Sequence, residues 1–306
     1  MFPESAKLRN DGLRAFVGRA RMTLSIVIPT RDRGETLERT LAAVAARLAE
    51  TPALEVVVVE NGGIATKPAV PSALAENGRL RIERLPPPAA GPAAARNLGI
   101  RLARGERILL LGDDTAPAVG CLAAHAGAVD GMQGRIEWDP SRPVTDLMRF
   151  LAPRGPQFWF AGLVDGDEIP FTALLGSNYS APRDWFLTEP FDESFPDAAF
   201  EDTELAWRFR ERGFKSRYCA GAVALHDHPY DEIEPFLARQ RRAGRSARSA
   251  VRRHPALLWW ALLRPLGMHA AKALLPSRRD EPERSWDRDS RRAYLAGFLG
   301  MATKAR

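Results

Sequence analysis

Cysteine is scarce in this chain of 306 residues, which carries only Cys121 and Cys219. The two lie far apart, and neither has a second cysteine at the short spacing of a metal-binding Cys-x-x-Cys motif. A disulfide-stapled secreted fold and a structural zinc site are therefore not expected, because both need cysteines in groups. A reducing compartment fits this composition, and we expect a cytoplasmic protein.

Long apolar runs are absent as well. The first 22 residues hold no uninterrupted stretch of signal-peptide length, and the longest run of the C-terminal part, Ala256 to Leu263, has eight residues. A helix needs about 20 apolar residues to cross a bilayer, so neither a cleaved signal peptide nor a membrane span is expected. No Walker loop and no Gly-x-Gly-x-x-Gly follows the first apolar run, which weighs against a nucleoside triphosphatase and a dinucleotide-binding enzyme.

The positive charge is concentrated at one end of the chain. Residues 1–238 carry 27 Lys and Arg against 33 Asp and Glu, whereas residues 239–306 carry 17 against 5. With 45% hydrophobic and 27% charged residues, the composition is that of an ordinary globular protein. An anionic partner is therefore expected for the basic tail and not for the acidic remainder.

The first 111 residues alternate between apolar runs and amphipathic segments. The expected elements are strands at 24–28, 54–59, 80–85 and 107–111 and helices at 35–49 and 93–103. Strand, helix and strand in this order form a βαβ unit, which gives a parallel sheet of the α/β class. Such sheets bind ligands at the carboxyl ends of their strands, where this chain carries Pro29, Glu60 and Gly112.

The second half is less regular. Residues 135–175 hold several Pro and Gly around Phe158-Trp159-Phe160, and we interpret them as a variable region over the sheet. The later expected elements are a helix from Glu201 to about Gly213, strands at 216–218 and 223–225, and a helix over 236–253.

Two groups of residues could bind a metal ion. Asp113 and Asp114 follow a buried strand, where carboxylates can join a hard divalent cation to phosphate oxygens, although acidic turns after strands are also common. His226 and His228 point the same way if their segment is extended. A neutral imidazole can ligate Mn or Mg beside a carboxylate, and the alternative is a hydrogen-bonded loop histidine.

Three further residues could act on a substrate. Glu201 and Asp202 open a helix, where one carboxylate can cap the helix and the other can act as a general base for a hydroxyl. Arg96 lies near the start of another helix, where a guanidinium and free amides can meet a diphosphate together. The alternative for Arg96 is an exposed helix arginine.

The ordered series of motifs resembles the family 2 glycosyltransferases of the GT-A fold over residues 24–228. The motifs are SIVIPTRDR, VVVVENGG, GPAAARNLGI, LLLGDDT, GSNYSAPRDWF, FDESF, FEDTELAWRFRERG and HDHP. The resemblance implies a Rossmann-like, mostly parallel mixed sheet flanked by helices. It also implies an inverting hexosyltransferase that uses a nucleotide-diphosphate sugar and a divalent cation, Mn or Mg, and acts on a glycan or lipid-linked acceptor in polysaccharide or cell-envelope synthesis.

The same resemblance assigns roles to individual residues. Asp114 and His226 correspond to metal ligands, and Asp202, with Glu201, to the catalytic base. The implied donor contacts are Pro29, Thr30, Arg31, Glu60, Arg96, Asp113 and Asn178. Two departures stand out: Glu60-Asn61-Gly62-Gly63 replaces the usual Asp-Asp-Gly-Ser or Asp-Asn-Gly-Ser, and Gly112 stands where many members have a further Asp. The second departure keeps an alternative open, a catalytically silent module that binds sugar nucleotides or glycans at a membrane.

We therefore expect an extension at 1–22, a GT-A domain at 23–230 and a basic helical region at 231–306. In that last region an Arg-rich helix precedes a segment with Trp259-Trp260 and several leucines. This pattern is typical of a helix lying in the interface of an anionic membrane, which would place the protein at the inner face of the cell membrane. The alternative is helices packed on the core or on a second subunit. Nucleic-acid binding is not expected, since the remainder is acidic and lacks a recognised binding motif.

Overall fold

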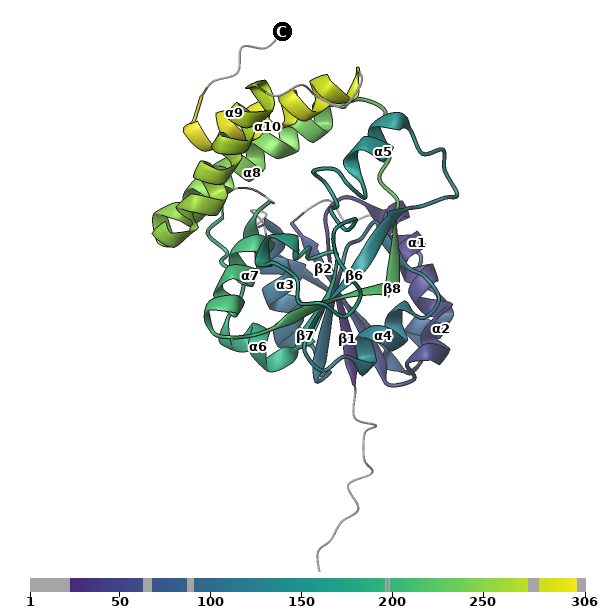
Figure 1. Cartoon of the computed structure of the whole chain (residues 1–306). Helices are drawn as coiled ribbons and strands as arrows, with labels where there is room; N and C mark the ends of the chain where they lie inside the picture. The colour runs from purple at the N-terminus through teal and green to yellow at the C-terminus, as the bar shows by residue number, and fades with distance from the viewer. Residues whose placement is uncertain are drawn as a thin grey trace, which may run out of the picture.

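The protein folds around one eight-stranded mixed sheet with helices on both faces (Figure 1). The structure is a computed structural model that describes residues 23–62, 68–86, 91–195, 197, 199–274 and 281–301. The strand order is β3-β2-β1-β4-β7-β6-β8-β5. The expected α/β class with a mostly parallel mixed sheet is confirmed, and the expected extension at 1–22 lies outside the described residues.

The first half of the chain forms the parallel part of the sheet. Its elements are β1 Leu24–Thr30, α1 Gly34–Ala45, β2 Leu54–Asn61, α2 Ser72–Ala75, β3 Leu80–Leu85, α3 Gly91–Leu102 and β4 Arg107–Leu111. The apolar runs predicted these strands because β1, β2 and β4 are buried on both faces. Pro29 was expected to stop the first strand, but β1 continues to Thr30. The strand tolerates the proline because the pairing with β4 has already ended at Val27.

The second half adds antiparallel pairs and was only partly predicted. Its elements are β5 Thr115–Pro117, α4 Cys121–Gly127, β6 Gly131–Trp138, α5 Asp146–Leu151, β7 Asn178–Pro182, α6 Arg183–Thr188, α7 Glu201–Glu211 and β8 Ser216–His226. The two strands expected at 216–218 and 223–225 are one strand. The register of β8 on β6 jumps from Cys219 to Val223 between Gly134 and Arg135, and this bulge divides the sequence pattern in two.

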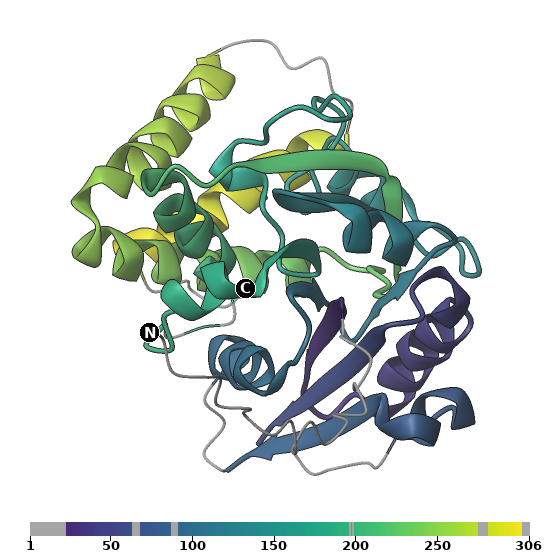
Figure 2. The same ribbon diagram turned by 90° about the horizontal axis from the view of Figure 1, so that it is seen from below.

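Three helices follow the sheet and form what we call the C-terminal arm, residues 231–301. They are α8 Glu234–Arg253, α9 Arg264–Leu274 and α10 Glu283–Leu299, with a π-helical turn at Trp259–Leu263. Seen from below, the arm (yellow-green) lies beside the second half of the chain and apart from the blue strands (Figure 2). Its buried side chains, among them Phe236, Ala250 and Leu257, join the hydrophobic clusters of the sheet domain. The arm is therefore packed on the core.

The arm is held together by a close crossing of α8 and α10. A Cβ atom added at Gly244 would lie 2.1 Å from the carbonyl oxygen of Tyr294, and one added at Gly297 would lie 2.1 Å from that of Arg241. The backbones approach so closely because glycine has no side chain at either point.

Gly244→Ala is expected to lower the free energy of unfolding by about 1–3 kcal/mol, because its methyl group would push the two helices apart. Gly267→Ala is the matched control, since a Cβ at this helical glycine of α9 meets nothing within 4 Å. The control should be neutral or stabilising by about 0.5–1 kcal/mol. Urea unfolding of both variants checks the pair, and equal stabilities would contradict the close crossing.

Candidate active site

A large cleft opens at the carboxyl ends of the parallel strands. Its volume is about 1350 Å³, and it is bounded by the ends of β1 and β4, the start of α7 and the C-terminal arm. Among the sequence-predicted site residues, the cleft is lined by Pro29, Thr30, Arg31, Arg96, Asp113, Asp114, Glu201 and Asp202. Segments from four parts of the chain therefore meet in a single cavity, which is larger than the roughly 300–1,000 Å³ of sites for one small molecule.

The acidic turn after β4 is fixed by residues of the first βα segment. The Thr30 hydroxyl donates to Asp113 Oδ2 at 2.8 Å, and Arg33 Nη1 lies 3.2 Å from Asp113 Oδ1 and 2.7 Å from Asp114 Oδ2. Burial, together with the negative charge of Asp114, raises the pKa of Asp113 to about 6. Burial also favours the neutral form of Asp114, but His226, Arg33 and His228 outweigh it and lower the pKa of this carboxyl.

His226 at the end of β8 and His228 just beyond it both face Asp114. His226 Nε2 lies 3.6 Å from Oδ1 of Asp114, and His228 Nδ1 lies 3.8 Å from Oδ2, which confirms that the two rings point the same way. Trp138 and Phe158 pack on the His226 ring at centroid distances of 5.4 and 5.0 Å. Burial lowers the pKa of His226 to about 4, so its imidazole is neutral at neutral pH.

The loop that carries these histidines is anchored by the residue between them. The backbone N–H of Asp227 donates to the carbonyl oxygen of Asp114 at 2.8 Å. Its carboxylate pairs with Arg39 of α1 at 2.7 Å and with Arg142 at 2.9 Å. The sequence interpretation missed Asp227 and Arg33 as site residues. For Arg33, the available signal was its place in the short turn between the first strand and the first helix.

The two carboxylates at the start of α7 differ in their surroundings. Glu201 Oε1 accepts a hydrogen bond from Arg96 Nη1 at 2.7 Å, and both side chains are buried. Asp202 accepts hydrogen bonds from the backbone N–H groups of Gly176 at 3.2 Å and Thr203 at 2.8 Å. Burial and the charge of Glu201 raise the pKa of Asp202, while Arg96 opposes this rise. The pKa of Asp202 is thus above its usual range, and Arg96, predicted to meet a diphosphate, is paired with Glu201.

Two predicted donor contacts lie away from the cleft lining. Glu60 pairs with Arg84 at 2.7 Å, and the next residue, Asn61, lines the cleft instead. Asn178 is fully buried between strands, where its side-chain amide donates to the carbonyl oxygens of Arg135 and Ala222.

Gly112 has a steric role beside the acidic turn. A Cβ atom there would lie 2.6 Å from the Thr115 hydroxyl and 2.9 Å from Asp114 Oδ1. A further aspartate at this position would therefore displace Asp114.

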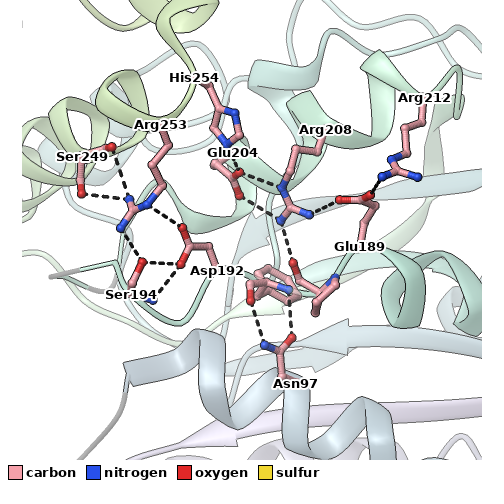
Figure 3. A network of polar contacts seen from close by, with 12 residues as sticks. Asn97, Glu189, Asp192, Ser194, Glu204, Arg208, Arg212, Ser249, Arg253 and His254 are labelled. Carbon is pink, nitrogen blue, oxygen red and sulfur yellow. Dashed lines mark hydrogen bonds and ion pairs between the residues drawn. The ribbon is translucent and has the colours of Figure 1, made fainter.

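A buried network of ion pairs fixes α7 against the arm (Figure 3). Glu204, two residues after the predicted base, accepts hydrogen bonds from Arg208 at 2.7 and 3.0 Å and lies 2.9 Å from His254 Nε2 at the end of α8. Arg208 also donates to the Pro190 carbonyl oxygen at 2.7 Å, and Asn97 of α3 makes two hydrogen bonds of 2.9 Å with the backbone of Phe191. The helix that carries Asp202 is thus joined to α3, to α8 and to the loop before it.

Among the described residues, no group of three or more His, Cys, Asp and Glu side chains is arranged to hold a metal ion. In the same part of the chain, none of the helices has the length and apolar character that a membrane span needs.

The chain resembles known proteins in sequence. Residues 25–134 match the family described as Glycosyl transferase family 2. The chain is 29% identical over 277 aligned residues to the validoxylamine A glucosyltransferase of Streptomyces hygroscopicus subsp. jinggangensis (strain 5008), covering 78% of this chain and 63% of that protein. It is 27% identical over 255 residues to the pre-mycofactocin glycosyltransferase of Mycobacterium tuberculosis (strain ATCC 25618 / H37Rv), covering 78% and 49%. The chain thus spans less than two thirds of the length of these relatives.

The fold is also shared with a solved structure. A mannosyltransferase from Pyrobaculum calidifontis, determined in complex with GDP-Man and Mn²⁺, matches with a TM-score of 0.59 and 17% identity over 92% of this chain and 87% of that chain. The family match covers β1 to β4 and the acidic turn, and the sheet has the arrangement of these transferases. Residues 25–134 thus match family 2 of the glycosyltransferases, and the described chain has the GT-A fold.

Proposed function

We propose that the protein transfers a hexose from a nucleotide-diphosphate sugar to a hydroxyl group of a glycan or lipid-linked acceptor, with inversion at the anomeric carbon. The observation that carries this proposal is that one cleft is lined both by Asp113 and Asp114 and by Glu201 and Asp202. Transfer needs both groups, because the leaving diphosphate must be neutralised and the acceptor hydroxyl must lose a proton. The family match and the two relatives support the class of reaction.

The donor would lie over the ends of β1, β2 and β4. Pro29, Thr30, Arg31 and Asn61 line this part of the cleft and are suited to hold the base and ribose. Asp113, fixed by the Thr30 hydroxyl, would accept hydrogen bonds from the ribose.

Asp114 and His226 would hold the divalent cation, and the residues present fit such an ion. Oδ1 of Asp114 and Nε2 of His226 are 3.6 Å apart, within reach of one ion with bonds of about 2.1 Å. His226 is neutral, the form in which imidazole binds metals, and its Nδ1 has no hydrogen-bond partner among the described residues. When bound, Mn²⁺ or Mg²⁺ neutralises charge on the leaving diphosphate. Arg33 adds a second positive charge beside Asp114.

Asp202 would act as the base on the acceptor. As the acceptor oxygen forms its bond to the anomeric carbon, the hydroxyl proton passes to a carboxylate oxygen of Asp202. The bond from the anomeric carbon to the diphosphate oxygen breaks on the opposite face, and its electron pair leaves with the diphosphate. Burial supports this role, because it raises the pKa of Asp202 and so makes the ionised form a stronger base. The Arg96 pair holds Glu201 beside it.

Thermal unfolding with a panel of nucleoside diphosphates, with and without Mn²⁺, tests the proposal. One nucleoside diphosphate should raise the Tm by about 5 °C in the presence of Mn²⁺, as expected for a ligand at about 100 times its Kd. The matching nucleoside monophosphate is the control and should act more weakly. No response to any nucleotide would overturn the proposal, and binding without release of nucleoside diphosphate from the sugar donor would favour the silent module.

A further inference from the structure

A row of exposed apolar side chains lies on the C-terminal arm. We call it the exposed row, and it consists of Leu258, Trp259, Trp260, Leu263, Leu266 and Met268. These side chains are between 36 and 57% exposed and fall within eleven consecutive residues. The other large exposed apolar side chains of the described residues are spread over the rest of the chain. A contiguous apolar surface of this kind marks an interaction site.

The exposed row begins at the rim of the cleft. Trp260, Arg264 and Met268 recur every four residues, so they share one helical face, and all three line the cleft. The Trp260 ring is held edge-on against Phe171 at 5.5 Å, and the Arg264 guanidinium lies over it at 5.5 Å. Trp259 and the leucines of the row are absent from the cleft lining and face solvent.

The segment that carries the exposed row has charges of one sign. Between Glu234 and Asp280 the sequence holds ten Arg, one Lys and no acidic residue. Three of these cations pair with acids of the sheet domain or α10. Arg242, Arg252 and Arg264 are exposed and form no ion pair with any described residue. The partner is therefore anionic, and the tryptophans indicate a lipid surface, because indole rings prefer the boundary between headgroups and acyl chains.

We propose that the exposed row and the free arginines of the arm bind the surface of an anionic lipid bilayer, with the row buried among the headgroups. Lipid binding would place the end of the cleft lined by Trp260, Arg264 and Met268 at the membrane surface. The acceptor is then an amphipathic molecule whose apolar part stays in the bilayer while its hydroxyl reaches Asp202. This statement about the acceptor rests on the proposed function, whereas lipid binding does not.

Vesicle flotation of the full chain, without donor or acceptor, tests the surface. The protein should float with vesicles of phosphatidylcholine containing about one third phosphatidylglycerol, and at least about tenfold less with phosphatidylcholine alone or at high salt. Trp259→Ser combined with Leu263→Ser should lower binding to the anionic vesicles by at least about tenfold, since two apolar side chains no longer enter the interface.

Val119→Ser combined with Val129→Ser is the matched control, because these exposed valines, 74 and 85% accessible, lie on the sheet domain. The control should float like the unmodified protein. Equal flotation of the row variant and the unmodified protein would overturn the proposal. A second result would also overturn it: light scattering that shows the unmodified protein and the valine control as dimers and the row variant as a monomer. Release of nucleoside diphosphate in the absence of vesicles should be unchanged in the row variant. A protein that floats but never releases nucleoside diphosphate would support the lipid surface and refute the proposed function.

Discussion

Asp202→Asn is expected to lower the transfer rate by about 10²–10⁴-fold, the usual contribution of a general base. The substitution keeps the size and shape of the side chain but removes its ability to take a proton. Donor binding should persist, because Asp202 belongs to α7 whereas the acidic turn and Arg33 belong to the first half of the chain. Rates with saturating donor, together with donor affinity by calorimetry, check both statements.

The Asp202 variant should remain folded. The carboxylate is buried beside Glu201, so loss of its charge removes a desolvation penalty and a repulsion. Its free energy of unfolding is therefore expected to equal or exceed that of the unmodified protein. Asp146→Asn serves as the matched control, since Asp146 is exposed and its ion-pair partner among the described residues is Arg149, three residues on. An Asp202 variant with full activity would exclude this residue as the base.

The pH dependence of kcat offers an independent check on the same residue. Burial and the charge of Glu201 raise the pKa of Asp202 above its ordinary value of 3.8. Because the base works only when ionised, activity should fall as the pH drops through this raised value. Glu201→Gln removes the neighbouring negative charge while Arg96 keeps its positive one, so the acid limb should move to lower pH. If the acid limb stays at the same pH in Glu201→Gln, the limb reports the ionisation of another group and not of Asp202.

The parallel half of the sheet was predictable because its strands bury mainly runs of apolar side chains. Strand β4, residues 107–111, was predicted with both ends correct. Strands β6 and β7 were missed, since their sequences contain glycines and polar residues. The structure shows why these residues can be buried: His125 lies 2.9 Å from both Ser180 Oγ and Asn178 Oδ1, and Gln133 donates to the Asn178 carbonyl oxygen at 3.2 Å. Hydropathy along the sequence shows only that these residues are polar. Whether polar groups find hydrogen-bond partners inside the core depends on the tertiary structure, so the burial of β6 and β7 could not be predicted.

The carboxylates of the site could be predicted from the sequence more readily than the contacts of its arginines. The acidic turn and the start of α7 could be located from local sequence, because strand ends and helix starts leave local signals, and the structure brings both to one cleft. The partner of Arg96 was not predicted, because Glu201 lies 105 residues away in the sequence. The residues around an arginine do not tell whether its guanidinium will bind a diphosphate or a carboxylate. Arg33 was missed for the same reason: its contacts with Asp113 and Asp114 are made across about 80 residues.

Asp114→Asn is expected to remove the dependence of donor binding on Mn²⁺ and to lower transfer at least about 100-fold, because loss of even an outer partner of a metal ligand costs 10–100-fold. The neutral amide is a weaker ligand and no longer balances the charge of Arg33. Binding of Mn²⁺ in the presence of nucleoside diphosphate, followed by electron paramagnetic resonance, gives a readout that does not depend on activity. Asp130→Asn is the matched control, a carboxylate paired with Arg217.

The position of Arg33 makes the Asp114 prediction more specific. A guanidinium that lies between Asp113 and Asp114 places positive charge where the diphosphate would arrive, so two sources of charge compete for the same role. If the cation neutralises the leaving diphosphate, EDTA and Asp114→Asn should abolish transfer, whereas Arg33→Gln should lower the transfer rate less. Transfer that survives EDTA but is lost in Arg33→Gln would assign leaving-group stabilisation to the guanidinium and exclude the cation from the step.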